Sequence, residues 1–297
     1  DDVVQNVWFD DFVVTRLAAP TDLTVSNITK TTASLDWNCI APEYEISYKK
    51  STDSNWTIVS TTDNHYTLSN LSRDTQYQAK IKAKYGENLY STEVPFADFK
   101  TYYYEPVVIS SLTDGLYSQN FNGNSIGDWE LINGSCRNKW FRQNDTGLES
   151  GTTDKCVYIS NSNAGSVMDW AYTVCDESQF SNLPVYSTTY FTKVFTLTPG
   201  SYQFSYKYAV DAVANSDYMR VLLVPANTTF EPGNYMPTGL NYVNEPEGWI
   251  AIDGGAQLTN QSASLGWRTM NVSVDVYPGG DAEPGDYKMV FVWHNDD

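Results

Sequence analysis

The chain has 297 residues, enough for two domains of ordinary size, and it carries 36 acidic against 18 basic residues. A net charge of −18 argues against nucleic acid and anionic lipid as partners, because phosphate binding needs concentrated positive charge. With 22 tyrosines and 9 tryptophans, the composition is typical of secreted proteins rich in β-structure. No apolar run has the length needed to cross a bilayer. We therefore expect an extracellular or outer-cell-surface protein without membrane insertion.

The opening stretch, residues 1–14, reads D-D-V-V-Q-N-V-W-F-D-D-F-V-V and predicts one β-strand. A strand without a partner presents an exposed edge, which native proteins usually cover. We interpret residues 1–17 as the closing strand of a preceding domain, followed by a linker to further domains of the same polypeptide. The alternative is that this strand pairs with the open edge of another copy of the chain.

Short β-type runs recur along residues 18–104, separated by turn residues. Seven such runs in under a hundred residues predict a β-sandwich. They cover residues 22–25, 33–37, 44–49, 56–59, 65–68, 77–85 and 96–102.

Four motifs in this region are specific: A-P-T-D-L-T-V at 19–25, S-L-D-W at 34–37, Y-E-I-S-Y-K at 44–49 and L-S-R-D-T-Q-Y-Q-A-K-I-K-A at 71–83. Together they resemble a fibronectin type III domain. The resemblance implies that Trp37 is the buried tryptophan of the second strand. It also implies that the hydroxyl of Tyr77 caps a nearby backbone group, as in a tyrosine corner. Such a domain most often serves as a spacer between its neighbours.

Longer β-type runs follow in residues 105–297, and none of them has a sustained helical period. They include Y-F-T-K-V-F-T-L-T-P-G-S-Y-Q-F-S-Y at 190–206 and D-Y-M-R-V-L-L-V-P at 217–225. Near the end, alternating apolar residues at 270–276 and 287–293 flank a turn rich in glycine and proline. These two runs predict a pair of antiparallel strands with a half-buried face.

The second region resembles the cleaved-adhesin and MAM-like jelly rolls of Bacteroidetes surface proteins. The resemblance rests on the aromatic strand and G-x-W turn at 115–129, on the runs at 190–225, and on W-R-T-M-N-V-S-V followed by a strand ending in W-H-N-D. Members finish with a strand of the form I-D-D-I-x-V, which is absent after Asp297, whereas W-F-D-D-F-V-V at 8–14 has this form. The predicted fold class is therefore all-β: a fibronectin type III sandwich at 18–104 and a larger jelly-roll sandwich at 105–297 that lacks its last strand.

The same resemblance implies a structural calcium ion, since members hold one near the first strand and the loop before the last. The matching positions are Asn120 and Asn122, with Asp296 and Asp297 at the far edge. Calcium takes six to eight oxygens from carboxylates, amides and carbonyls. This chain has amides at 119–120 where members often carry an acidic residue, and it contains no D-x-D-x-D-G loop.

The long connection at residues 227–253 is the candidate ligand loop, because connections of this length in compact domains are often functional. Rings and polar groups alternate along it, as carbohydrate binding requires: sugar C–H faces stack on aromatic rings and hydroxyls meet amides and carboxylates. The candidate ligand-binding residues are Tyr235, Tyr242, Asn244, Glu247 and Trp249. The alternative is that Trp249 begins a strand and simply packs. Trp129, Trp140 and Trp267 are interpreted as core residues.

Catalytic chemistry finds little support in the sequence. The two histidines, His65 and His294, fit no serine or cysteine triad, and no glycine-rich phosphate loop occurs. The one close carboxylate pair beside aromatics, Glu245 and Glu247, is the weakly supported candidate for acid/base chemistry. We expect no enzymatic activity.

The four cysteines lie at positions 39, 136, 156 and 175, without a C-x-x-C spacing, which argues against a zinc site. A disulfide between Cys136 and Cys156 is favoured, and buried free thiols are the alternative.

From these observations we predict a non-catalytic segment of a secreted or cell-surface bacterial protein, in which a fibronectin type III spacer holds an adhesin-like, carbohydrate-binding module. Its partner would be a glycan or an extracellular-matrix or host protein. Two alternatives belong to other classes. In one, the segment is an accessory region of a large secreted peptidase or glycoside hydrolase. In the other, it is a structural stalk or filament subunit completed by strand exchange with another copy.

Overall fold

The computed structural model describes residues 10, 14, 16–93, 97–123, 125–136, 138–144, 155–160, 187–210, 212, 214–233, 235–259 and 266–295. The chain divides into two compact units, Asp1–Tyr102 and Tyr103–Asp297. Apart from the single-turn 3₁₀ helices η1 (Ile109–Ser111) and η2 (Thr113–Gly115), every regular element in the described part is a β-strand. The all-β prediction is confirmed.

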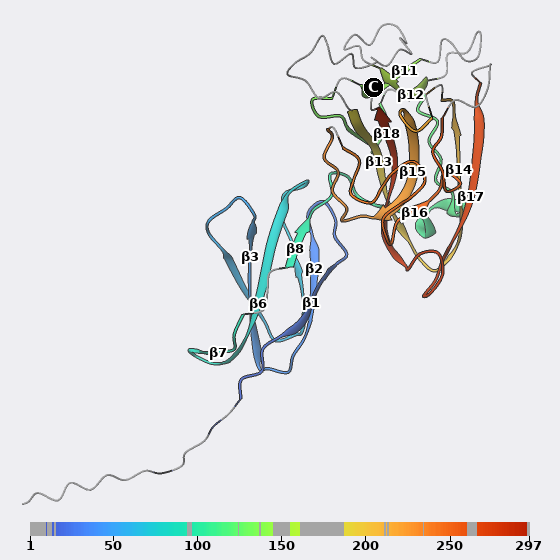
Figure 1. The fold of residues 1–297 in the computed structure, drawn as a ribbon. Helices are drawn as coiled ribbons and strands as arrows, with labels where there is room; N and C mark the ends of the chain where they lie inside the picture. Colours follow the sequence, from blue (N-terminus) through green and yellow to red (C-terminus); the bar gives the residue numbers. More distant parts are fainter. Residues whose placement is uncertain are drawn as a thin grey trace, which may run out of the picture. The chain divides into compact units, whose positions relative to one another are not determined.

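The first unit is a sandwich of two antiparallel sheets (Figure 1). One sheet has the order β1-β2-β5 and the other β4-β3-β6, with β7 and β8 both pairing with β6. Each run predicted from the sequence corresponds to a strand. The strands are β1 (Thr21–Ser26), β2 (Ala33–Asn38), β3 (Glu43–Lys50), β4 (Thr57–Thr61), β5 (His65–Leu68), β6 (Gln76–Gly86), β7 (Leu89–Tyr90) and β8 (Ala97–Lys100).

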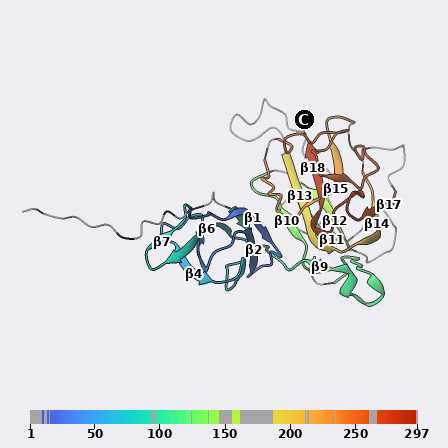
Figure 2. The same cartoon turned by 90° about the horizontal axis from the view of Figure 1, so that it is seen from below.

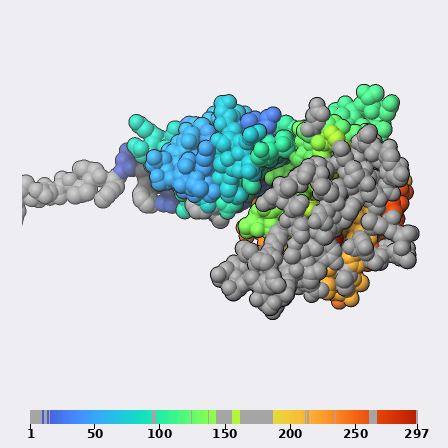
Figure 3. All heavy atoms as spheres, turned by 90° about the horizontal axis from the view of Figure 1, so that it is seen from above, coloured from blue at the N-terminus to red at the C-terminus, as the bar shows by residue number. Residues whose placement is uncertain are grey.

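Alternating side chains of β3 and β6 point into this sandwich, as the period of a half-buried strand requires. Trp37 of β2 is 3% exposed and its ring meets Tyr44 of β3 edge-on at 5.2 Å. The Tyr77 hydroxyl accepts a 2.8 Å hydrogen bond from the Ser72 backbone N–H. Both roles expected from the motifs, the buried tryptophan and the tyrosine corner, are therefore confirmed. Figure 3 shows one face of this domain, blue to cyan, as a closely packed surface.

The second unit is built on a six-stranded sheet of order β10-β13-β18-β15-β16, with β9 pairing parallel to β13 (Figure 2). Two further antiparallel pairs, β11-β12 and β14-β17, complete the unit. The strands are β9 (Val107–Val108), β10 (Glu130–Ile132), β11 (Lys139–Asn144), β12 (Lys155–Ser160), β13 (Ser187–Leu197), β14 (Gly200–Tyr208), β15 (Tyr218–Pro225), β16 (Ile250–Ala251), β17 (Arg268–Val276) and β18 (Gly285–Asn295).

The main core of the second unit lies between the six-stranded sheet and the two strand pairs. Side chains from β13, β15 and β18 meet Val274 and Val276 of β17 there. Trp129 and Trp140, predicted as core, are each 5% exposed; Trp129 stacks on Phe191 at 4.5 Å. Trp267 is only half-buried and packs beside Cys156 and Tyr158.

The six-stranded sheet is buried on both faces. Its outer face presents Tyr190, Leu222 and Val290 to residues 226–252, which follow β15, include β16 and contain nearly all of the connection predicted at 227–253; the two sets of side chains form a second, smaller core. This explains why β15 contains the unbroken apolar run V-L-L-V at 221–224, since only a strand covered on both sides favours such a run.

The pairing predicted for the last two strands is wrong. Strand β17 pairs with β14 along its whole length, whereas β18 lies between β13 and β15 in the other sheet. The turn between them therefore carries the chain from one layer of the sandwich to the other. Buried residues on both faces of β18, such as Met289 and Val290, mark it as a central strand and not as one half of a half-exposed hairpin.

Two further predictions concern the start of the chain and the cysteines. Most of residues 1–14 lie outside the described residues; of that segment Asp10 and Val14 are described, and both are exposed. Cys136 and Cys156 are both buried but form no disulfide with each other, so the favoured pairing is wrong and the buried-thiol alternative holds for both. Cys175 lies outside the described residues.

Candidate binding loop

The 226–252 connection is held by a succession of tight turns. Leu240 N–H bonds to Pro237 O at 2.9 Å, and Trp249 N–H bonds to Pro246 O at 3.1 Å. Asn241 forms an Asx-type turn, because its Oδ1 accepts the N–H groups of Val243 and Asn244, both at 2.9 Å. The segment is long, but its backbone is extensively hydrogen-bonded.

A buried arginine of β15 anchors this connection from beneath. Arg220 is 0% exposed, and its Nε donates a 2.6 Å hydrogen bond to Oδ2 of Asp253, which is 3% exposed. Its Nη1 donates to the carbonyl oxygens of Asn241 and Asn244. Nη2 donates to Glu245 Oε2 at 3.2 Å. A charge this deeply buried is tolerated because every guanidinium nitrogen is paired.

The Asp253 carboxylate, which pairs with Arg220, is itself fixed by backbone hydrogen bonds. Asp253 Oδ2 accepts the N–H of Val221 at 2.9 Å, and Oδ1 accepts the N–H of Gly255 at 3.0 Å. Nearby, the Tyr206 hydroxyl donates to the carbonyl of Ile252 at 2.9 Å, and burial raises the pKa of this phenol. The end of the connection is thus bonded to both layers of the sandwich.

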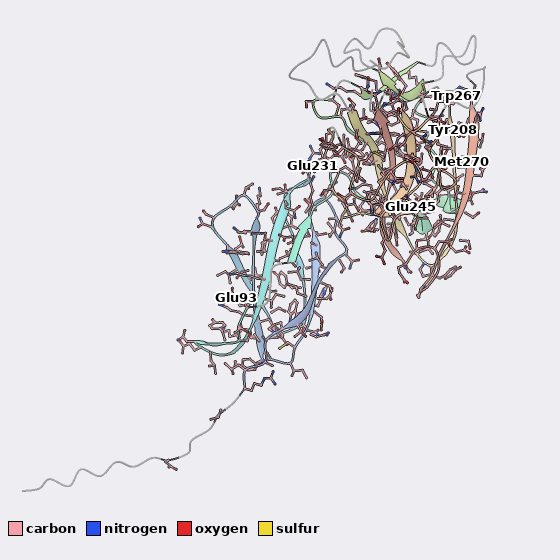
Figure 4. All side chains as sticks on the ribbon, in the orientation of Figure 1. Glu93, Tyr208, Glu231, Glu245, Trp267 and Met270 are labelled. Atoms are coloured by element: carbon pink, nitrogen blue, oxygen red, sulfur yellow. The ribbon has the colours of Figure 1, made fainter. Side chains whose placement is uncertain are left out.

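Four of the five predicted ligand-binding residues lie on the surface of this connection. Tyr235 is 79% and Tyr242 40% exposed, and Asn244 and Glu247 are exposed as well. The Tyr242 ring meets Tyr218 edge-on at 6.4 Å. Asn244 and Glu247 lie on either side of Glu245 in the chain, and Glu245 is labelled in Figure 4. The exposed residues of this connection offer aromatic faces, amides and carboxylates, the chemistry that carbohydrates and polar peptides require.

Trp249 lies differently from the other four. It is half-buried, and its ring packs edge-on against Phe230 at 5.9 Å as part of the second core. Its ring therefore serves the attachment of the connection to the sheet. Glu245 is likewise engaged, since it pairs with Arg220, which leaves Glu247 as the exposed member of the carboxylate pair.

The predicted calcium ligands are engaged in local hydrogen bonds where they are described. Asn120 Oδ1 accepts the N–H of Asn122 at 3.1 Å, and Asn122 Oδ1 accepts the N–H of Lys155 at 2.6 Å. Asp296 and Asp297 lie outside the described residues. Within the described ranges no group of three or more His, Cys, Asp or Glu side chains could hold a metal ion. These residues alone supply too few free oxygens for calcium, and the site stays a prediction.

Both histidines form side-chain contacts with residues of neighbouring strands. His65 Nδ1 lies 2.9 Å from Asp36 Oδ1 on the face of the β1-β2-β5 sheet, and both side chains are about half exposed. His294 Nδ1 lies 2.8 Å from Thr188 Oγ1 on the neighbouring strand. Burial raises the pKa of the Cys136 thiol, which disfavours the reactive thiolate.

Arg220 is the residue that sequence reasoning missed. The available signal was its position, because an arginine inside D-Y-M-R-V-L-L-V interrupts an otherwise apolar strand. A charge in such a place needs a buried partner. The partner could not be named from the sequence, since Asp253 follows 33 residues later and is brought back only by the fold.

The order of the sheets and the tyrosine corner together define the first unit as a fibronectin-type β-sandwich. The sequence profile of the fibronectin type III domain matches residues 18–96, so this part of the chain is such a domain. Domains of this type are common in extracellular proteins and are typically non-catalytic spacers or binding regions. Within the described residues, no helix is long and apolar enough to span a membrane.

Solved structures similar to the chain include a protein described as a myokine, with 22% identity over 29% of this chain and 99% of that chain, at a TM-score of 0.27. A computationally redesigned β-sandwich protein is 31% identical over 28% of this chain and 93% of its own, at a TM-score of 0.26. The FN1–FN3 domains of chicken CNTN1 are 22% identical over 28% of this chain and 31% of theirs, also at 0.26. No curated protein matches the chain.

Proposed function

We propose that the second domain is a non-catalytic binding module that captures a glycan or a glycosylated matrix or host protein, while the fibronectin type III domain acts as its spacer. The ligand binds to Tyr235, Tyr242, Asn244 and Glu247, which we call the 235–247 surface. The observation that supports this most is the combination of exposed Tyr235 and Tyr242 with a backbone fixed by buried Arg220. Aromatic rings on an already ordered loop bind with little ordering cost.

In this proposal the Tyr242 ring stacks on the C–H face of a sugar, and Asn244 and Glu247 bond to its hydroxyls. Trp249 supports the loop from the core side and does not contact the ligand. A calcium ion at Asn120, Asn122, Asp296 and Asp297 would stabilise the module, and it is the one cofactor in the proposal.

The test is a glycan and matrix-protein binding array with the intact chain, run in calcium and again in EDTA. We expect the Tyr235→Ala/Tyr242→Ala variant to lose binding at least tenfold. Tyr277→Ala is the matched control, since Tyr277 is 46% exposed but lies outside the connection. Binding that survives the double variant, or that falls equally in the control, would reject the site. Binding that is equal in EDTA would reject a role for calcium.

A further inference from the structure

The connection at residues 227–253, which carries the 235–247 surface, has charges of one sign. It contains four acidic residues and no basic residue. Two of the four pair with the buried Arg220, whereas Glu231 and Glu247 are exposed. A ligand of this surface therefore meets negative charge from the connection itself.

The connection crosses the outer face of the six-stranded sheet, and one exposed carboxylate lies near each end of the crossing. On β13, the backbone of Thr188 exchanges hydrogen bonds of 2.6 and 3.1 Å with Gly233, two residues after Glu231. On β15, the buried arginine holds Glu245 (Figure 4), two residues before Glu247. Strand β18 lies between these two strands, so the attachment points are about 10 Å apart across the sheet. The two exposed tyrosines lie between the carboxylates in the chain.

Two described cations bond to the connection from the sheet beneath it, and both are engaged with its backbone. Arg220 is 0% exposed, and its Nη1 donates to the carbonyl oxygens of Asn241 and Asn244. Lys288 donates a 2.6 Å hydrogen bond to Thr228 O, and its ammonium lies 5.5 Å from the ring centroid of Phe230. These cations therefore attach the connection to the sheet, and their donors are directed away from a ligand on the outer surface.

Backbone N–H groups are the other donors that commonly bind anions in proteins, and in this connection they form its own turns. Val243 and Asn244 both donate to Asn241 Oδ1. Leu240 and Trp249 each donate to the carbonyl oxygen of a proline. The carboxylates, amide oxygens and ring faces of the surface instead suit a ligand that donates hydrogen bonds through hydroxyl groups.

From this arrangement we propose that the 235–247 surface selects glycans that are uncharged where they bind, and that Glu231 and Glu247 exclude sialylated, sulfated and uronate-containing glycans. Like charges brought together across an interface suppress the wrong partners. At physiological salt this repulsion extends about 8 Å from each charge, so a carboxylate near each end of the crossing acts on a ligand held between them. The specificity rests on the proposed function, because it concerns the same site.

The test is a glycan array with the intact chain, in which each oligosaccharide is printed in three matched forms: uncharged, with a terminal sialic acid, and with a sulfate ester. We expect the chain to bind the uncharged form at least tenfold more tightly at physiological salt. Equal or tighter binding of the anionic forms overturns the specificity and leaves the proposed function standing. If no form binds, the proposed function is wrong and the specificity falls with it.

Salt separates repulsion from steric exclusion by the added group. At about 1 M salt the screening length falls to about 3 Å, so the anionic forms should gain affinity while the uncharged form keeps its own. Anionic forms that stay excluded at high salt would show that the carboxylates do not set the specificity.

Charge reversal shows which residues are responsible. Glu231→Lys/Glu247→Lys should lower the ratio of uncharged to anionic affinity at least tenfold; the ratio is measured because Glu247 also contacts the ligand. Asp53→Lys/Asp63→Lys is the matched control, since it makes the same change of net charge at exposed positions of the first domain and should leave the ratio unchanged. Circular dichroism and urea unfolding establish that both variants fold. A ratio that stays constant in the first variant, or falls equally in the control, overturns the assignment.

Discussion

Two buried cations show how a single residue shapes the second domain, and they do so in opposite ways. Arg220 is fully paired by Asp253, Glu245 and two backbone carbonyls. Lys193 on β13 is 2% exposed, yet its ammonium lies 3.8 Å from Asp128, beyond hydrogen-bonding distance. We therefore expect removal of the first to cost stability and removal of the second to gain it.

Arg220→Met should lower the free energy of unfolding by about 3 kcal/mol or more, because it leaves the Asp253 carboxylate buried without its cation. Urea unfolding followed by tryptophan fluorescence measures the change. Arg73→Met is the comparison, since Arg73 is exposed in the first domain, and it should stay within about 0.5 kcal/mol. Equal effects of the two substitutions would show that the buried network contributes nothing to the fold.

Lys193→Met should raise the free energy of unfolding by about 1 kcal/mol at neutral pH, since an apolar chain of similar length removes a desolvated charge. Burial lowers the pKa of Lys193 from its ordinary value of 10.5. The folded chain thus releases this proton before the unfolded chain does, and the penalty disappears as the pH rises from the folded pKa toward 10.5. The advantage of the variant should shrink over that window. An advantage that is constant with pH would contradict a charge effect.

At the scale of elements, the 226–252 connection is both a cover and a candidate binding surface. Its inner side chains, including Phe230, Leu240 and Trp249, close the outer face of the six-stranded sheet. Its outer side carries Tyr235 and Tyr242. The start is fixed as well, because Lys288 of β18 donates a 2.6 Å hydrogen bond to Thr228 O. The side chains that pack on the sheet and the side chains that are exposed to a partner therefore come from the same connection.

Trp249→Ala should lower the free energy of unfolding by about 2 kcal/mol, because the half-buried ring leaves a cavity against Phe230. Tyr235→Ala, at a position that is 79% exposed, should change it by less than about 0.5 kcal/mol. Thermal unfolding of both variants measures the difference. If Trp249→Ala is as stable as the unchanged chain, the packing role is wrong and Trp249 is again a candidate for ligand binding.

The sequence was sufficient for the first domain, because each strand there has one buried face and its period-2 pattern survives. In β6, for example, Tyr77, Ala79, Ile81 and Ala83 alternate with polar residues. The second domain departs from this rule at β18, where residues on both faces are buried. The alternation of apolar residues therefore did not show that β18 lies in the centre of a sheet. Likewise, aromatic composition identified the 227–253 loop, but only the fold separates Trp249 in the core from Tyr242 on the surface.

At the scale of the whole chain, charge is unevenly distributed between the two domains. Residues 18–102 carry 10 acidic and 8 basic residues, whereas residues 103–297 carry 22 and 9. In the first domain many of the lysines are neutralised across the sheet: Lys84 pairs with Glu43 at 2.8 Å and Lys82 with Glu45 at 2.7 Å. With 8 basic and 10 acidic residues, the first domain is nearly neutral, and the excess negative charge belongs to the domain that carries the candidate surface.

The Arg220 network also bears on the rate at which a partner would be captured. Its five hydrogen bonds, to Asp253, Glu245, Asn241 and Asn244 and from Val221 to Asp253, are formed when the domain folds. A loop fixed in this way has no slow rearrangement to complete after encounter, so association is governed by diffusion and orientation, and selectivity between partners resides in how slowly each one leaves. Loosening the arginine would introduce such a rearrangement and slow the capture of a partner, although the arginine reaches the surface only through the carbonyls of Asn241 and Asn244 and the carboxylate of Glu245.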